Sequence, residues 1–347
     1  MKKNFLKTVL IFSVIGLCVS FSTCYFINVP AYLTPDAFHE AKTQPLNGDP
    51  VTGLASDGEM TVAVTLSGAI AWSGDHGVTW ELATFKTKNV GDGLSFNSVA
   101  WGDGYFFAGG SAAKAAWSVD GKVWSDGVIG PMNPENIFDV AVGRMNQQTV
   151  FVAGGSRGRL AYSVGKPEGP WAQVIMSPFG DRSTNSGEPI DNVYGITYGS
   201  VKGSGVFVAV GTTGRIAIMN NFSKHFYGPV ATSTRNNYRA VTFGNERFVA
   251  VGEGSTLMVT ANPENYSWIK IQEKGFNMQP FVNVIYAPCF NYFIMQDQDS
   301  ILRFSDDCEN WSASNFRSIF PSGISAMVGT NKRIILADAG GRIFYSN

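Results

Sequence analysis

The chain has 347 residues, of which 15% are charged, 13% are aromatic and 39 are glycine, and its formal net charge is −1. Its lysines and arginines are scattered without a long basic stripe, which argues against nucleic-acid binding. Abundant glycine and aromatic residues indicate a single large all-β body with many tight turns, and this length requires no second domain.

The first 35 residues indicate a targeting segment. An uncharged stretch over residues 8–34, apolar at its centre, follows three lysines, Lys2, Lys3 and Lys7, as in a secretory signal. Three outcomes are open: cleavage near Ala31, retention as a membrane anchor, or lipidation of Cys24. All three export the rest of the chain, residues 36–347, to the periplasmic or extracellular side. Retention or lipidation would also tether it to the membrane.

A short phrase then recurs along the chain. Its copies are Ser73–Trp80, Ser118–Trp124 and Ser305–Trp311. In each phrase an Asp takes up backbone N–H groups of a tight turn, a Gly or its substitute supplies a positive φ, and a Trp is buried between neighbouring sheets. The structural positions are Ser73, Asp75, Gly77, Trp80, Ser118, Asp120, Gly121, Trp124, Ser305, Asp307 and Trp311.

Similar strands surround each phrase and define seven repeating units. The expected first strands are residues 53–55, 98–101, 139–142, 195–198, 240–243, 283–286 and 325–328. Second and third strands follow, and the phrase leads into a fourth. Four strands in a period of about 45 residues indicate a β-propeller blade, so we predict an all-β, seven-bladed propeller of four-stranded blades.

The last unit lacks a fourth strand, because the sequence given stops at Asn347 after the third. We expect residues 37–42 to supply the missing strand, with Phe38 standing where Trp80 stands one unit later. Pairing the first strand with the last would remove open sheet edges.

By these phrases the chain resembles the Asp-box propellers, also called BNR-repeat proteins. This family includes sialidases and non-enzymatic assembly factors such as the photosystem II assembly propellers. The resemblance covers the chain from about residue 37 to its end and implies a propeller fold. We expect this chain to lie closer to the non-enzymatic members than to the true sialidases.

Catalytic signals are weak. The sialidase motif Phe/Tyr-Arg-Ile-Pro is absent from the sequence, and the three histidines, His39, His76 and His225, lie in different units without metal-ligand spacing. Asp297 and Asp299 form a carboxylate pair of the kind that glycosidases use, but neighbouring turn carboxylates are more often solvated or turn-forming. We therefore predict no catalytic residue, no metal and no cofactor.

One column of the repeat is basic. The position that opens the third strand holds, in unit order, Ala69, Lys114, Arg159, Arg215, Thr256, Ile301 and Arg342. These side chains should lie on the face opposite the Asp-box turns, joined there by Arg157. They would suit an acidic peptide, a C-terminal carboxylate or an anionic glycan. The alternative is that an Arg after a Gly is only a soluble way to begin a strand.

The same face should carry the longest loop between units, residues 177–192, which is rich in Pro, Gly and Ser. Loops on rigid scaffolds often bind partners, and Phe179 would be the natural anchor. The loop is equally well explained as a disordered decoration.

Two cysteines belong to the predicted body. Cys289 and Cys308 fall in two turns of the sixth unit that lie on the same face, and an exported protein permits disulfides. A Cys289–Cys308 bridge is therefore expected, with two free thiols as the alternative.

Together these features predict an exported, membrane-tethered and non-catalytic propeller that binds an envelope protein as a scaffold or assembly factor. The alternative is a glycan-binding protein or a degenerate sialidase-like glycosidase.

Overall fold

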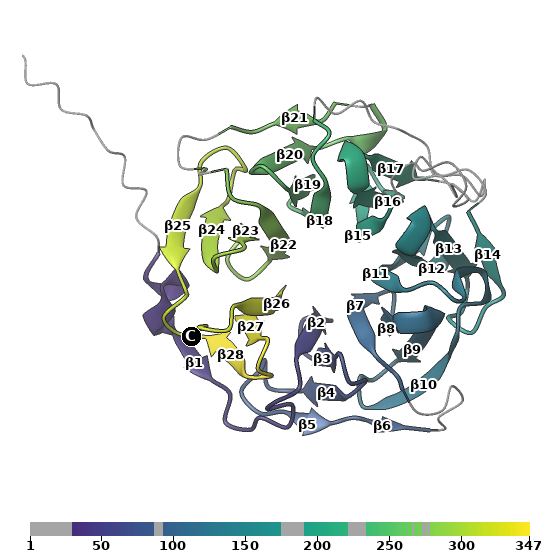
Figure 1. The fold of residues 1–347 in the computed structure, drawn as a ribbon, viewed down its shortest axis with the longest axis horizontal. Helices are drawn as coiled ribbons and strands as arrows, with labels where there is room; N and C mark the ends of the chain where they lie inside the picture. The colour runs from purple at the N-terminus through teal and green to yellow at the C-terminus, as the bar shows by residue number, and fades with distance from the viewer. Residues whose placement is uncertain are drawn as a thin grey trace, which may run out of the picture.

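A computed structural model describes residues 30–86, 93–174, 191–220, 234–265, 267–272, 276 and 278–347. They form seven β-sheets arranged as blades around a central axis, which confirms the seven-bladed propeller (Figure 1). The described residues contain strands and seven short 3-10 helices, η1 to η7, and no α-helix. None of the described helices is long and apolar enough to cross a membrane.

Blades one to four follow one another along the chain. Blade one contains β2 (Val51–Ser56), β3 (Thr61–Thr65), β4 (Ile70–Ser73) and β5 (Glu81–Leu82). Blade two contains β7 (Phe96–Gly102), β8 (Tyr105–Gly110), β9 (Lys114–Ser118) and β10 (Val123–Val128). Blade three contains β11 (Ile137–Met145), β12 (Gln148–Gly155), β13 (Leu160–Val164) and β14 (Trp171–Gln173). The described part of blade four contains β15 (Val193–Val201), β16 (Ser204–Gly211) and β17 (Ile216–Met219).

Blades five to seven complete the ring. Blade five contains β18 (Tyr238–Gly244), β19 (Arg247–Gly252), β20 (Thr256–Thr260) and β21 (Ile269–Lys270). Blade six contains β22 (Phe281–Ala287), β23 (Tyr292–Asp297), β24 (Ile301–Ser305) and β25 (Ser312–Asn315). Blade seven contains β26 (Ile324–Gly329), β27 (Ile334–Asp338), β28 (Ile343–Ser346) and, from the other end of the chain, β1 (Phe38–Glu40).

Two of the seven 3-10 helices precede β1, and the other five lie in connections between strands. The seven are η1 (Ala31–Leu33), η2 (Pro35–Ala37), η3 (Ser111–Ala113), η4 (Gly130–Met132), η5 (Ser156–Gly158), η6 (Thr212–Gly214) and η7 (Pro263–Asn265). Three of them, η3, η5 and η6, join the second and third strands of blades two, three and four.

The ring closes as predicted. β1 pairs antiparallel with β28, so that Phe38 lies opposite Ser346. Trp124 lies opposite Ser118 in the same way, because the next pair of the ladder joins Ser125 to Trp117. Phe38 is 7% exposed and its ring meets that of Phe316 edge-on at 5.2 Å, so it seals the seam between blades six and seven.

Blade two departs from the four-stranded pattern. A short extra strand, β6 (Thr84–Phe85), pairs parallel with β10 and makes this sheet five-stranded. Figure 1 shows β6 on the outer rim, directly after β5. The connection from blade one therefore covers the outer edge of blade two, which would otherwise be open to pairing.

The core lies between the blades. Second strands are buried on both sides, and β16 shows why the sequence reads as it does: Val206–Val210 is a continuous apolar run with no exposed residue. Each hydrophobic cluster joins two neighbouring blades, as where side chains of β12 and β13 meet those of β15 and β16.

Aromatic rings at the ends of four inner strands lock neighbouring blades together. These are Trp101, Tyr198, Phe243 and Tyr286, and each contacts a Phe of its own second strand with centroids 4.5, 5.1, 4.6 and 5.0 Å apart. The Tyr198 ring lies over Gly143 of the preceding blade, where an added Cβ would come within 2.1 Å of the ring. Glycine is required there because a ring occupies the space of a side chain.

The expected disulfide is absent. Cys289 and Cys308 are both free thiols. Cys308 packs among side chains between blades five and six, whereas Cys289 packs between blades six and seven, so the two lie on opposite sides of their own sheet. Burial raises the pKa of each thiol to about 11, which makes both poor nucleophiles at neutral pH.

Candidate functional site

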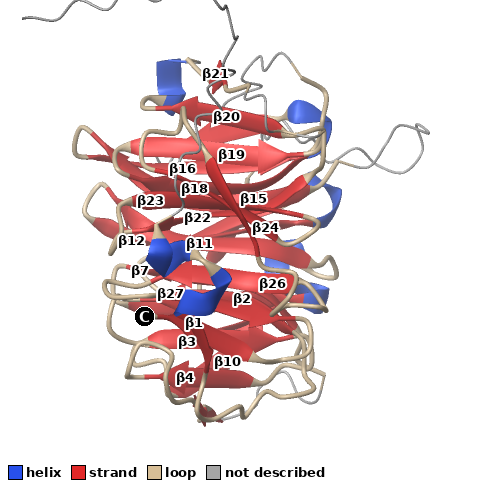
Figure 2. Ribbon diagram, turned by 90° about the vertical axis from the view of Figure 1, so that its left-hand side faces the viewer, coloured by secondary structure: helices blue, strands red, loops and turns tan. Residues whose placement is uncertain are grey.

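The propeller has two faces, seen edge-on in Figure 2. We call the face that carries the turns between third and fourth strands the Asp-box face. We call the opposite face, where the inner strands begin and where η3, η5 and η6 lie, the bulge face.

The three Asp-box turns share one set of hydrogen bonds. In blade one, Ser73 Oγ donates to Asp75 Oδ1 at 2.8 Å, the Gly77 N–H donates to Ser73 Oγ at 2.8 Å, and Trp80 Nε1 donates to the Gly77 carbonyl at 3.0 Å. Asp75 Oδ1 also accepts the backbone N–H groups of Val78 and Thr79. The Ser73 hydroxyl, the Asp75 carboxylate and the backbone N–H groups of the turn thus bond to one another.

Blades two and six repeat these bonds. Asp120 Oδ1 accepts two backbone N–H groups at 2.9 Å each, and Asp307 Oδ1 accepts two at 2.7 and 2.8 Å. Trp124 and Trp311 each donate to the carbonyl of the positive-φ residue, which in blade six is Cys308 with φ of 64°. Partial burial alone would raise the pKa of Asp307, but these N–H groups and the Asn310 amide lower it to about 2.

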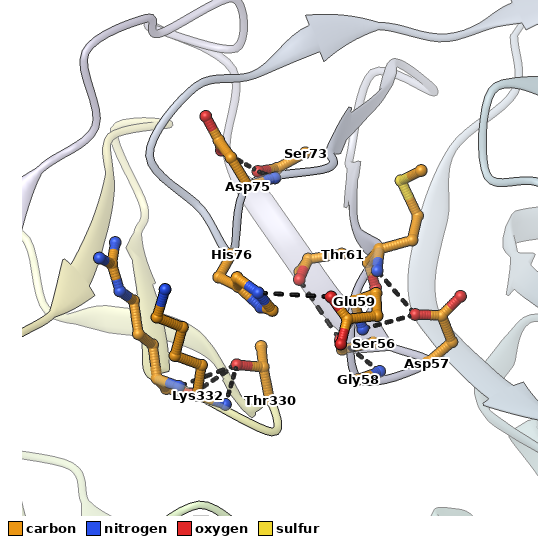
Figure 3. Close-up of polar contacts among 12 residues, drawn as sticks. Ser56, Asp57, Gly58, Glu59, Thr61, Ser73, Asp75, His76, Thr330 and Lys332 are labelled. Atoms are coloured by element: carbon orange, nitrogen blue, oxygen red, sulfur yellow. Dashed lines mark hydrogen bonds and ion pairs between the residues drawn. The ribbon is translucent and has the colours of Figure 1, made fainter.

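His76 belongs to the first of these turns, as Figure 3 shows. Its φ is 58°, and its Nε2 lies 3.5 Å from Glu59 Oε2 in the neighbouring hairpin. Asp75 is bonded to Ser73 and does not contact His76 in this view. These contacts tie two turns of blade one together and bring no nucleophile to the histidine.

The bulge face is built by a different device. The inner strand of every blade carries a one-residue bulge near its start, where the register shifts relative to the second strand. The bulged residues are Thr52, Asn97, Phe138, Tyr194, Arg239, Val282 and Ser325. Thr52, Asn97 and Ser325 are bonded to backbone carbonyls, which leaves an arc of two aromatic, one cationic and one apolar side chain on blades three to six, Phe138, Tyr194, Arg239 and Val282.

Three members of that arc form a stack. The Phe138 and Tyr194 rings lie 5.9 Å apart at 23°, and the Arg239 guanidinium sits 4.8 Å above the Tyr194 ring. Arg239 also pairs with Glu253 and is 38% exposed. Val282, 38% exposed, continues the arc. Stacked rings beside a guanidinium are typical of surfaces that bind proteins, because they offer contact area with little loss of side-chain freedom.

The arc surrounds a cavity in the central channel of about 390 Å³ that all seven inner strands line. The charged residues of its lining are Arg239 and Asp139. Asp139 accepts bonds from Ser98 Oγ and from the N–H groups of Val140 and Ile196 at 2.9 and 2.6 Å, so it joins blades two, three and four. Despite these bonds, burial raises the pKa of Asp139 to about 6.

A second cavity of about 360 Å³ lies nearer the Asp-box face, between Trp101 and Tyr198. Blade three has Val142 in the place where its neighbours carry those rings. The cavity therefore lies where the row of rings at the ends of the inner strands is interrupted by Val142.

The five predicted basic residues do lie on the bulge face, and each has a local partner. Arg215 pairs with Asp191 at 2.8 Å, and Arg342 pairs with Asp338 at 2.7 Å. Arg157, 44% exposed, lies 3.3 Å from Glu135. Lys114 and Arg159 donate to carbonyl groups of Gly93 and Pro131 at 2.9 and 3.3 Å. The predicted anchor Phe179 lies outside the described residues, as does Cys24.

The carboxylates weighed as a glycosidase pair serve the turn. Asp297 is 1% exposed, pairs with Arg303 at 2.8 Å and accepts the N–H groups of Asp299 and Ile301. A carboxylate this enclosed is not open to a sugar. Within the described ranges, no group of three or more His, Cys, Asp or Glu residues is placed to hold a metal ion.

Sequence reasoning missed the bulged column and Asp139. The sequence did hold a signal, because the bulged position differs in residue type in every unit, whereas the positions on either side of it repeat residue types between units. The role of this position could not be inferred from sequence, since only the bulge shows that these side chains face the channel.

Several solved structures resemble the chain, although no protein-family model matches it and no curated protein matches it in sequence. YCF48 bound to a D1 peptide has 14% identity over 89% of this chain and 94% of that chain, with a TM-score of 0.63. YCF48 from Cyanidioschyzon merolae has 15% identity over 90% and 99%, with a TM-score of 0.66. The chain shares their propeller fold.

The WD40 propeller domain of Doa1 is similar to the same extent, with 11% identity over 89% of this chain and 97% of that chain and a TM-score of 0.62. Identities this low establish the architecture and leave the ligand open. No match shows that the chain belongs to the Asp-box family, which it resembles in its turn phrases.

Proposed function

We propose that this protein is a non-catalytic propeller that binds a partner protein on its bulge face and acts as a scaffold or assembly factor. The observation that carries the proposal is the Phe138–Tyr194–Arg239 stack at the channel mouth. It is held on rigid strands and remains partly exposed.

Two further points support this reading. A propeller of the same architecture, YCF48, has been solved with a peptide bound. The carboxylates considered for catalysis, Asp297 and its turn neighbour, are accounted for by turn formation. The basic residues Lys114, Arg157, Arg159, Arg215 and Arg342, with Phe179, would enlarge the docking surface around the stack.

We further propose that residues 1–35 export the protein and tether it to the membrane, with Cys24 as the lipidation site if the segment is processed as a lipoprotein. The partner would then be an envelope protein.

The test is crosslinked capture from envelope membranes with the full-length protein. A Phe138→Ala/Tyr194→Ala variant should lose the partner while still unfolding in one cooperative transition, at a slightly lower denaturant midpoint. The matched control is Leu82→Ala/Val119→Ala, which removes two exposed apolar side chains away from the bulge face; they are 56% and 67% exposed. Equal capture by both variants would rule out the stack as the docking site.

Binding of an anionic glycan is the second candidate, because a sugar ring could stack on Tyr194 while Arg239 meets its carboxylate. Glycan-array binding that free sugar competes away, with no protein captured, would favour it.

A further inference from the structure

Three enclosed carboxylates of this protein share one kind of partner. Asp191, Asp297 and Asp338 are each at most 5% exposed, and each pairs with an arginine: Arg215 at 2.8 Å, Arg303 at 2.8 Å and Arg342 at 2.7 Å. Enclosing a carboxylate without a cation is costly, so such pairing is expected.

Asp139 differs from these three, since it is partly exposed in the channel. It is hydrogen-bonded from three blades, yet across the described part of the chain no Lys, Arg or His lies within ion-pairing distance of it. The other charged residue of the cavity, Arg239, pairs with Glu253 instead. Among the described residues, no cation is therefore paired with the carboxylate that lines the channel.

The bonding of Asp139 indicates which cation fits. Its Oδ1 accepts two bonds and its Oδ2 accepts one, so little acceptor capacity is left on the carboxylate. A guanidinium pairs best through two parallel bonds, whereas an ammonium needs a single acceptor and sits on a long, flexible stem. A lysine side chain therefore suits the site better than an arginine.

The mouth of the channel suits the same side chain. Asp139 directly follows Phe138 in β11, so a lysine that reaches the carboxylate passes the Phe138 and Tyr194 rings. Aromatic faces attract ammonium groups and pack against alkyl stems. The cavity of about 390 Å³ has room for one such side chain.

We infer that the channel is a receptor for a lysine side chain of the partner protein, which enters from the bulge face beside Phe138 and Tyr194 and forms an ion pair with Asp139. The inference rests on the proposed function, since it names the group by which that partner is recognised.

The experiment titrates the full-length protein with two probes, N-acetyl-lysine N-methylamide and its norleucine counterpart, which keeps the stem and lacks the ammonium. The reporters are the amide resonances of Ile196 and Val140, both hydrogen-bonded to Asp139. The lysine probe should shift them saturably and bind roughly tenfold more tightly than norleucine, as expected for one charge-assisted hydrogen bond. Equal responses to the two probes would overturn the inference.

Two variants localise the effect. Asp139→Ala should remove the preference for lysine. Asn283 lines the same cavity at the equivalent position of blade six, where it bonds the next backbone N–H as Asp139 does, so Asn283→Asp should tighten lysine binding. Wild-type lysine affinity in both variants would contradict the ion pair. The probe comparison on the wild-type protein stands even if a variant fails to fold.

Failure of this inference is distinguishable from failure of the proposed function. A partner that is captured through Phe138 and Tyr194 while the lysine probe does not bind overturns the lysine receptor alone. If the partner is captured independently of Phe138 and Tyr194 and the lysine probe does not bind, the bulge face is not the docking face.

Discussion

The two faces of the propeller are built on opposite principles. On the Asp-box face, three blades use the same residues to make the same bonds, and the bonded groups belong to the turn itself. On the bulge face, the seven equivalent bulged positions hold seven different residue types. The repeated positions hold the turns together, whereas the varied positions include the four that form the proposed docking surface.

The sharpest test of this contrast compares one aromatic residue from each face. Trp124 is fully buried and donates to the Gly121 carbonyl, so Trp124→Ala should lower the free energy of unfolding by about 3–5 kcal/mol. Tyr194 is only partly buried at the mouth, so Tyr194→Ala should cost about 1 kcal/mol. Denaturant unfolding of both variants measures the difference. Similar losses of unfolding free energy would contradict the view that only the Asp-box face stabilises the ring.

The second test separates the basic residues of the bulge face from one another. Arg342→Ala would leave Asp338, which is 0% exposed, without its cation and should cost roughly 3 kcal/mol. Arg157→Ala removes a partner of Glu135 from a more exposed pair and should cost less than about 1 kcal/mol. If Arg342→Ala lowered the free energy of unfolding as little as Arg157→Ala does, the pair with Asp338 would not stabilise the fold. Both arginines would then be explained by binding and not by stability.

The third and smallest effect is a difference in the response to pH. The pKa of Asp307 is about 2, below its ordinary 3.8, so its contribution to stability is present above pH 4 and is lost as pH falls toward 2. The pKa of Asp139 is about 6, so its contribution has the opposite sign: it is present below about pH 4 and is lost as pH rises through 6.

Unfolding free energies from pH 2 to 7 check both signs. Asp307→Asn should flatten the acid side of the profile, and Asp139→Ala should remove the decline between pH 4 and 6. If Asp307→Asn changed the profile between pH 4 and 6 and Asp139→Ala changed its acid side, the pKa shifts given for the two carboxylates would be wrong.

The architecture could be predicted from sequence because short, repeated motifs determine its turns and strands locally. Each Asp-box phrase fixes its own turn, and the run Val206–Val210 shows a strand buried on both sides without reference to the rest of the fold. The closing strand was also visible, since Phe38 and Trp80 occupy equivalent places.

The thiol positions, the ion pairs and the aromatic stack could not be predicted, because they depend on the direction in which side chains point. Cys289 and Cys308 fall in turns of the same face, but the register of their strands sends them to opposite sides of the sheet. The partner of Arg215, Asp191, lies 24 residues away and is recognisable only after folding. The same limit hid Phe138, Tyr194 and Arg239, because a bulge changes the direction of one residue without a fixed sequence signature.

The closing strand has a mechanical consequence. The ring is covalently continuous everywhere except where β1 meets β28, a joint of three residue pairs with Phe38 wedged between two blades. Leu33, just ahead of β1, is fully buried in the cluster that contains Phe38, and Ala41 and Gln44, just after β1, are bonded to Ile343. A pull on the chain ahead of Leu33 would load this packing and the β1–β28 pairing first, and opening the joint would expose the edge of β28. Tension at the N-terminus and the closure of the ring are thus coupled through one short stretch of the chain.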